Sequence, residues 1–151
     1  MAQFSDDSEA ELATCHPALQ KTCRRVIPHF NFTVLEGNRS KRRQNRLLEE
    51  DRTQVAYPNS KHNAMRVGQE EPDFSRSDAV DLAPWPIDWE DTPRFCVLAG
   101  HMMQAFDQLK REGKIPSHLA LRWGGDWDAD DRTDDNKFDD LPHFEVIDTN
   151  G

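Results

Sequence analysis

The sequence predicts an α+β fold, a small antiparallel sheet of about four strands flanked by helices. One long amphipathic segment, residues 92–112, has apolar side chains at helical spacing. Short apolar runs with the length and composition of strands occur at residues 30–35, 79–83, 119–123 and 143–147. Only a loop separates the last two runs, so we expect the strands to form an antiparallel sheet.

Length and charge restrict the class of protein. The chain has 151 residues and a mass of 17.5 kDa, so we expect residues 1–151 to form a single domain. A charged fraction of 31% predicts solvated loops beside the core. The net charge of -9 argues against nucleic-acid binding through phosphate neutralisation. The charge is unevenly distributed, with basic residues clustered at 39–46 and acidic residues at 126–140.

Cysteine usage and the N-terminus favour a protein made in the cytoplasm. The three cysteines, Cys15, Cys23 and Cys96, have neither a disulfide nor a zinc-finger spacing, which is typical of a reducing compartment. The N-terminus lacks the pattern of a signal peptide, and no segment approaches 18 apolar residues. We therefore expect no stable membrane insertion.

The N-terminal half is predicted to contain helices, one strand and a long loop. Ser8 is a plausible N-cap for a helical pattern that extends to Ile27, and Pro17 should divide it into a short and a longer helix. The strand-like run that follows ends at Gly37, and a polar helix is expected over residues 40–50. Residues 51–78 have no sustained periodicity and are predicted to be a loop.

The C-terminal half begins with the buried strand 79–83. Thr92 followed by Pro93 predicts the start of the long helix, and Gly113 predicts its end. A strand at 119–123, an acidic loop at 126–140 and a last strand from His143 to about Ile147 complete the expected order.

Four polar residues lie where an apolar run would otherwise continue or begin: His62, Asp81, Asp140 and His143. Two histidines and one carboxylate with an open fourth position make a catalytic zinc shell, and a second carboxylate near the metal-bound water can act as a general base. The alternative is that His62 is a loop histidine and Asp81 a structural strand residue. The remaining histidines have no partner pattern: His16, His29, His101 and His118.

Four ordered blocks of sequence resemble one known family. They are Ser60-Lys61-His62, Ala79-Val80-Asp81-Leu82-Ala83-Pro84-Trp85, Trp123-Gly124-Gly125-Asp126-Trp127 and Asp140-Leu141-Pro142-His143-Phe144. Their order is similar to that in the peptidoglycan zinc peptidases. This family contains D-alanyl-D-alanine carboxypeptidases and phage endolysins that are L-alanyl-D-glutamate endopeptidases. The segments around residues 16–20 and 32–44 agree as well, so the resemblance covers about residues 12–147.

The resemblance implies a role for each matching residue. His62, Asp81 and His143 match the zinc ligands, and Asp140 matches the general base. Arg39 matches an arginine that holds substrate and polarises the scissile carbonyl. Further substrate-binding residues are implied at two matching positions and one cleft wall: Ser60, Gln44 and Trp123. The implied fold is that of the D-alanyl-D-alanine peptidases and hedgehog-like proteins, with the zinc site in a cleft at the sheet.

Spacing leaves alternatives open at two positions. The common family pattern places the aspartate seven residues after the histidine, whereas Asp81 follows His62 by nineteen because residues 63–78 are inserted. Asp73 and Asp78 are therefore alternative ligands, although the apolar context favours Asp81. Asp139 and, less strongly, Glu145 are the rivals of Asp140 for the role of base.

Two further features have a structural alternative. Asp126-x-Asp128-x-Asp130 begins like a calcium loop, but Asp131 and Lys137 stand where the loop requires glycine and glutamate, so a solvated acidic loop is the default. Trp123 and Trp127 could form a wall of the cleft or be core indoles at a tight turn.

The sequence thus predicts a monomeric zinc peptidase acting on bacterial peptidoglycan. We expect an L-alanyl-D-glutamate endopeptidase that accumulates in the host cytoplasm as a phage endolysin and reaches the wall after release. The alternatives are a D-alanyl-D-alanine carboxypeptidase and a metal-binding structural phage protein without hydrolytic activity.

Overall fold

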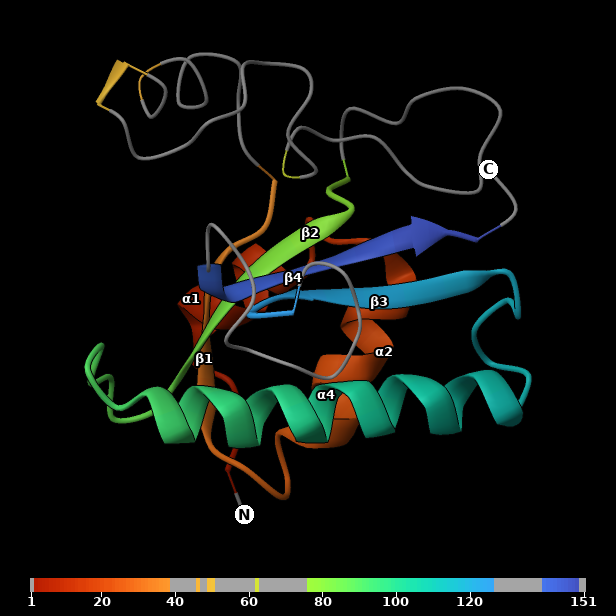
Figure 1. The fold of residues 1–151 in the computed structure, drawn as a ribbon, viewed down its shortest axis with the longest axis horizontal. Helices are drawn as coiled ribbons and strands as arrows, with labels where there is room; N and C mark the ends of the chain where they lie inside the picture. Colours follow the sequence, from red (N-terminus) through yellow and green to blue (C-terminus); the bar gives the residue numbers. More distant parts are fainter. Residues whose placement is uncertain are drawn as a thin grey trace.

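The computed structural model describes residues 2–38, 46, 49–50, 62, 76–126 and 140–149. Its helices are α1 (Asp6–Leu12), α2 (Pro17–Val26) and α4 (Thr92–Arg111), and its strands are β1 (Phe32–Glu36), β2 (Ala79–Pro84), β3 (Leu119–Gly124) and β4 (Asp140–Asp148). The strands form an antiparallel sheet in the order β1-β2-β4-β3 (Figure 1). The predicted α+β fold class is confirmed.

One face of the sheet is apolar, and the other carries polar side chains from β2 and β4. Val80 and Leu82 of β2 and Phe144 and Val146 of β4 belong to the hydrophobic core, on the face where α2 and α4 pack. Because successive strand residues point to opposite faces, Asp81, His143 and Glu145 point away from these helices. The apolar face fixes the register of the sheet, so it also fixes which polar residues of β2 and β4 lie beside one another.

Helix α4 has the start, buried face and end that the sequence predicts. It begins at Thr92, and the Asp91 side chain accepts a hydrogen bond from the Arg94 amide as the N-cap. Gly113 follows it with a φ of 76°, a left-handed conformation that glycine adopts without a Cβ clash. The predicted apolar positions are all buried: Phe95, Leu98, Ala99, Met102, Phe106 and Leu109.

The N-terminal helices divide at Pro17 as predicted, but the cap of α1 differs from the expectation. Ser5 is the N-cap, and its hydroxyl accepts the hydrogen bond of the Ser8 amide at 3.2 Å. Ser8 is instead a buried residue, whose hydroxyl contacts Thr33 of β1 at 3.0 Å and accepts from the Val34 amide at 3.1 Å. Helix periodicity alone did not reveal that α1 covers the free edge of β1.

Parts of two predicted segments lie outside the described residues. Of the expected helix over 40–50, Arg46 and Glu49 are helical, and the Glu50 amide donates to the Arg46 carbonyl at 3.0 Å. Most of the loop over 51–78 and residues 127–139 of the acidic loop are not described. Strand β4 begins at Asp140, three residues before the predicted start.

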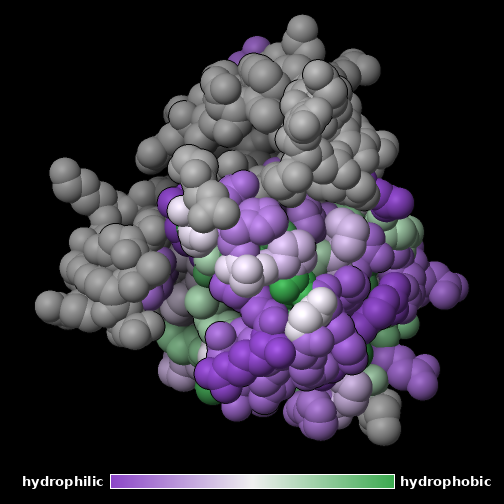
Figure 2. Space-filling view, turned by 90° about the vertical axis from the view of Figure 1, so that its right-hand side faces the viewer, coloured by the Kyte–Doolittle hydropathy of each residue, from purple (hydrophilic) through white to green (hydrophobic). Residues whose placement is uncertain are grey.

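Surface and core agree with the composition. The side shown in Figure 2 is largely hydrophilic, as a charged fraction of 31% predicts. Cys15 and Cys23 are unpaired core residues, and burial raises the pKa of the Cys15 thiol to about 12. None of the helices in the described ranges has both the length and the apolar composition required to span a bilayer.

Candidate metal centre

Three side chains from distant parts of the sequence converge above the sheet. Asp81 of β2 and His143 of β4 are direct cross-strand partners, which brings their side chains together on one face. His62 joins them from the segment before β2. Its Nε2 lies 3.2 Å from Asp81 Oδ1 and 3.2 Å from His143 Nδ1, and His143 Nδ1 lies 3.4 Å from Asp81 Oδ1. The three atoms thus form a nearly equilateral triangle.

The size of this triangle matches one face of a tetrahedral metal shell. Nitrogen and oxygen ligands about 2.0–2.1 Å from a zinc ion stand about 3.3–3.4 Å from one another in tetrahedral geometry. The observed separations of 3.2, 3.2 and 3.4 Å agree with that value. This buried group, His62, Asp81 and His143, could therefore hold a metal ion, with a fourth position left for another ligand.

His62 is oriented by the backbone. Its Nδ1 lies 2.8 Å from the carbonyl oxygen of Gly37, so Nδ1 must carry the proton and donate it there. The lone pair then lies on Nε2, which faces Asp81 and His143. The Gly37 turn is itself held by α1, since the Gly37 amide donates to Glu11 Oε2 at 3.0 Å.

The absence of a side chain at Gly37 permits this arrangement. A Cβ there would stand 2.3 Å from Thr14 Oγ1 and 2.6 Å from the Glu11 carbonyl oxygen. Glycine therefore allows α1 to pack against the turn that presents its carbonyl to His62.

His143 is oriented by a relay of two charged side chains, Glu145 and Arg122, that are hydrogen-bonded in series. Its Nε2 lies 2.8 Å from Glu145 Oε1, and Arg122 of β3 donates to Glu145 Oε2 at 2.8 Å. A carboxylate can only accept, so Nε2 carries the proton and Nδ1 presents its lone pair toward His62 and Asp81. An anchored outer nitrogen on each histidine is typical of metal ligands, because the second hydrogen bond fixes tautomer and ring orientation.

The charges at the site favour a cation. With both outer nitrogens protonated, two nitrogen lone pairs and one carboxylate oxygen face one another, and only a positive charge between them relieves the repulsion. Burial alone would lower the pKa of His143, but the hydrogen bonds that the imidazolium donates to the carboxylates of Asp81 and Glu145 raise this pKa to about 9. Burial would raise the pKa of Asp81, but the charge of His62 and the hydrogen bond of His143 hold it well below its usual range. Without a metal, a proton takes the position of the cation.

The buried carboxylate of Glu145 is stabilised in its charged form. Burial would raise its pKa, but the hydrogen bond and charge of His143 and the charge of Arg122 lower it. Only about 3% of Glu145 is exposed, whereas 20% of the Asp81 side chain remains accessible. The Glu145 carboxylate is thus shielded from solvent, although the Arg122 side chain that holds it is 35% exposed, and the group of three stays accessible at Asp81.

The structure places only some of the other predicted site residues. Asp140 is the first residue of β4, opposite Gly124, and lies outside the converging group. Asp78, the alternative ligand, is buried beside the start of β2 and is likewise not in that group. The remaining predicted positions lie outside the described residues: Arg39, Gln44, Ser60, Asp73, Trp127 and Asp139.

Trp123 lies in the hydrophobic core, which agrees with the alternative that it is a core indole rather than a wall of the cleft. It is 7% exposed, its ring stacks on Phe144 with centroids 6.4 Å apart, and its Nε1 donates to the Leu141 carbonyl at 2.7 Å. That hydrogen bond fixes the chain two residues before His143. Nothing among the described residues supports the calcium loop, most of which lies at 127–139.

Sequence reasoning missed the two groups that orient the histidines. Glu145 was considered only as a rival base, although its spacing of two from His143 on a strand places both on the same face. That spacing was the sequence signal from which the His143–Glu145 pair could have been predicted. Arg122, on the neighbouring strand, holds the Glu145 carboxylate. The Gly37 carbonyl gives no sequence signal, because every residue has a carbonyl group.

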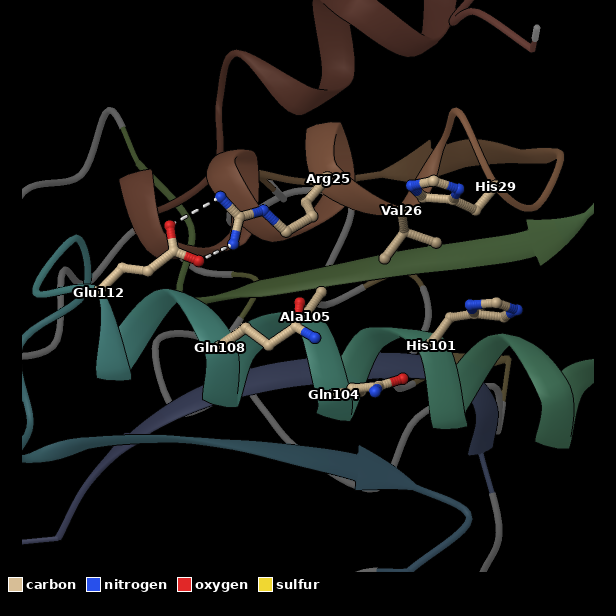
Figure 3. Close-up of a pocket in the computed structure, with 8 residues that line it drawn as sticks. All are labelled: Arg25, Val26, His29, His101, Gln104, Ala105, Gln108 and Glu112. Atoms are coloured by element: carbon tan, nitrogen blue, oxygen red, sulfur yellow. Dashed lines mark hydrogen bonds and ion pairs between the residues drawn. The ribbon is translucent and has the colours of Figure 1, made fainter.

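A groove elsewhere on the molecule shows that size does not identify the site. It measures about 530 Å³ and lies between α2 and α4, on the helical side of the sheet (Figure 3). Arg25 and Glu112 form an ion pair at one end, and His29 and His101 lie at the other. None of the three converging residues lines this groove, so the candidate metal centre is located by the chemistry of its side chains.

Fold and site together define a class of small α+β proteins with a His-Asp-His group on an antiparallel sheet. The family model for phage L-alanyl-D-glutamate peptidases matches residues 1–147, and the chain belongs to this family. The L-alanyl-D-glutamate peptidase of Escherichia phage T5 is 31% identical over 133 residues, covering 84% of this chain and 82% of that protein.

A solved structure agrees on the fold. The crystal structure of the Serratia marcescens L-Ala D-Glu endopeptidase ChiX superposes with a TM-score of 0.66 and 23% sequence identity, covering 97% of this chain and 91% of that one. This likeness shows the fold, whereas the family model and the phage T5 relative confirm the family predicted from the sequence.

Proposed function

We propose that this protein is a zinc-dependent peptidoglycan peptidase that hydrolyses the bond between L-alanine and D-glutamate in the stem peptide. The observation that carries this proposal is the triangle of His62, Asp81 and His143 in a chain of the phage L-alanyl-D-glutamate peptidase family. As a phage endolysin it would act on the wall of the host cell after release, and residues 1–151 would serve as one catalytic domain.

The donor set favours zinc over calcium. Two imidazole nitrogens and one carboxylate oxygen in tetrahedral arrangement suit zinc, whereas calcium requires six to eight oxygen ligands. His62 Nε2, Asp81 Oδ1 and His143 Nδ1 would hold the ion and leave one position open toward the substrate. When bound there, zinc lowers the pKa of water and polarises the scissile carbonyl.

The chain itself would position substrate and transfer the proton. Asp140, three residues before His143, would accept a proton from the attacking water and deliver it to the leaving amine of D-glutamate. Arg39 would hold the substrate and stabilise the developing oxyanion with its fixed fork of donors. Ser60 and Gln44 would add hydrogen bonds to the stem peptide.

A digest of purified peptidoglycan tests the bond that is cut. Mass spectrometry should find products that carry a new N-terminal D-glutamate, and a chelator should stop their release until zinc is restored. Release of terminal D-alanine alone would instead establish a D-alanyl-D-alanine carboxypeptidase. A protein that binds zinc but releases nothing would have only a structural role.

The proposed base can be separated from the ligands. Asp140→Asn should keep its zinc in a metal assay and lose peptidase activity, because the amide cannot accept the proton. Loss of zinc from this variant would make Asp140 a ligand, and unchanged activity would remove it from the mechanism.

A further inference from the structure

An exposed tryptophan stands out on a surface that is otherwise mostly hydrophilic. Among the described residues, the large apolar side chains that are exposed are Trp85, Trp89, Val97 and Met103. Trp89 stacks on Phe95 with ring centroids 5.8 Å apart. Trp85 is 52% exposed, and within the described part of the chain its indole contacts no other ring.

The backbone on both sides of Trp85 is fixed. The Trp85 amide donates to the Asn31 carbonyl at 3.0 Å, and Arg94 donates to the carbonyls of Trp85 at 3.0 Å and Pro86 at 3.2 Å. The Arg94 guanidinium also lies 5.6 Å from the centre of the Phe30 ring. The backbone that carries the indole is therefore held in place, so a ligand that packs against Trp85 need not order this segment.

Trp85 forms one wall of a small cleft with neutral polar sides. The cleft measures about 210 Å³, and its other lining groups include the side chains of Gln3, Ser5, Asn31 and Thr33. None of its lining residues carries a charge. Within the described residues the side-chain amides of Gln3 and Asn31 make no hydrogen bond, so both are available to hydrogen-bond a ligand.

The chemistry of this cleft fits a sugar better than a peptide. Sugar rings have apolar faces that pack on an indole and hydroxyl groups that bond to amides and hydroxyls. The N-acetyl groups of wall sugars are also neutral. The stem peptide, by contrast, carries the carboxylate of D-glutamate, for which the cleft offers no cation.

The strand register relates the cleft to the metal centre. Thr33 pairs with Ala83, and Ala83 lies two residues from Asp81 on β2, so Thr33 and Asp81 are on the same face of the sheet. Trp85 follows Asp81 by four residues, a separation of about 13 Å along an extended chain. The L-alanine of the scissile bond is attached to a sugar of the glycan strand, which puts neighbouring sugars within reach of the cleft.

We propose that the cleft beside Trp85 is a subsite for N-acetylated sugars of the glycan strand from which the cleaved peptide hangs. This inference rests on the proposed function for the identity of its ligand. It makes Trp85 a substrate-binding residue that distinguishes wall-bound stem peptides from free ones, and it assigns Asn31 and Gln3 to hydrogen bonds with the sugar.

Kinetics on two substrates test the subsite. For the wild type and Trp85→Ala, kcat/KM is measured on intact sacculi and on a glycan-free stem peptide. The ratio of the two values should fall roughly tenfold in Trp85→Ala, the usual scale for loss of a buried aromatic contact, and Trp85→Phe should restore most of it. The matched control is Trp89→Ala, an exposed tryptophan outside the cleft, which should leave the ratio unchanged.

Direct binding separates failure of the subsite from failure of the proposed function. A tetramer of β-1,4-linked N-acetylglucosamine is titrated into the wild-type protein and followed by heteronuclear NMR. Shifts should concentrate on the Trp85 indole and the amides of Asn31 and Thr33. An unchanged kinetic ratio in Trp85→Ala, or no shift at these positions, overturns the subsite. If the wild type cleaves neither substrate, the proposed function fails, and the titration still decides whether the cleft binds sugar.

Discussion

The two histidines of the candidate metal centre are oriented in different ways. His62 comes from a segment outside the sheet and is oriented by a backbone carbonyl, that of Gly37. His143 lies on β4 and is oriented by a carboxylate that Arg122 holds in turn. The two rings also present opposite nitrogens, Nε2 from His62 and Nδ1 from His143.

Because the two anchors differ, substitutions and pH should affect the two histidines differently. A carbonyl neither titrates nor changes with a side-chain substitution, so the His62 side depends on the shape of the Gly37 turn. The Glu145 carboxylate can be titrated or replaced, so the His143 side depends on charge.

Removal of either histidine should have the largest effect on zinc content and activity, and the effect should be the same for His62 and His143. His62→Ala and His143→Ala should each reduce zinc from about one equivalent per chain to near zero and abolish peptidoglycan cleavage, because two remaining ligands hold zinc weakly. Metal analysis by mass spectrometry and turbidity of permeabilised cells measure the two effects. Circular dichroism establishes that the variants fold, and full zinc content in either one would remove that histidine from the shell.

Zinc binding should depend on pH because His143 must lose a proton before it can bind the metal. Since the pKa of His143 is raised to about 9, zinc affinity should rise roughly tenfold per pH unit from pH 6 to about 9. Competition with a chromophoric chelator measures this slope. A flat profile would mean that no proton leaves the site on binding.

The metal-free protein should show the complementary dependence in stability. A raised pKa at His143 stabilises the fold below about pH 6.5, and this contribution is lost as the pH rises through about 9. The lowered pKa values of Asp81 and Glu145 mean that their ionised carboxylates stabilise the fold above about pH 4. This contribution is lost as the pH falls. Thermal unfolding after chelation should thus give the highest Tm between about pH 5 and 6.5, and bound zinc should remove the alkaline decline.

Replacement of the charged anchor should weaken the site without removing it. Glu145→Gln keeps the shape but removes the charge that holds His143, and zinc affinity should fall about 10–100-fold, as for other residues that hydrogen-bond a metal-ligating histidine. Glu112→Gln is the matched control, because Glu112 is an exposed carboxylate whose partner is Arg25 on the helical side. Equal zinc affinity in the two variants would show that His143 needs no carboxylate.

Disturbance of the backbone anchor should have the smallest effect on zinc and act mainly on folding. In Gly37→Ala the new Cβ would meet Thr14 and the Glu11 carbonyl, so the turn must shift at a cost of about 1–3 kcal/mol. Gly100→Ala is the control, since a Cβ there meets nothing within 4 Å and an alanine within α4 should stabilise by about 0.5–1 kcal/mol. Chemical denaturation measures both. If Gly37→Ala is as stable as the wild type, the turn is not tightly packed.

Local pattern was enough to predict the elements that carry the site. The spacing of Phe95, Leu98 and Met102 predicted α4, and the apolar runs predicted the strands, because burial on one face imposes its own period on a helix or a strand. The cap of α1 was assigned wrongly to Ser8, since the role of that residue depends on β1, which is distant in sequence. Local signals do not contain such contacts.

Sequence alone was enough to identify the three residues of the candidate metal centre, His62, Asp81 and His143, and the family of the chain. Only the tertiary structure decided that these side chains form a triangle of metal-ligand size, that Gly37 and Glu145 select the nitrogen each histidine presents, and that Trp123 is in the core. The physical reason is that tautomer, ring orientation and ligand separation depend on cross-strand register and on a turn packed by α1. These are distances between residues far apart in the chain, and no local pattern encodes them.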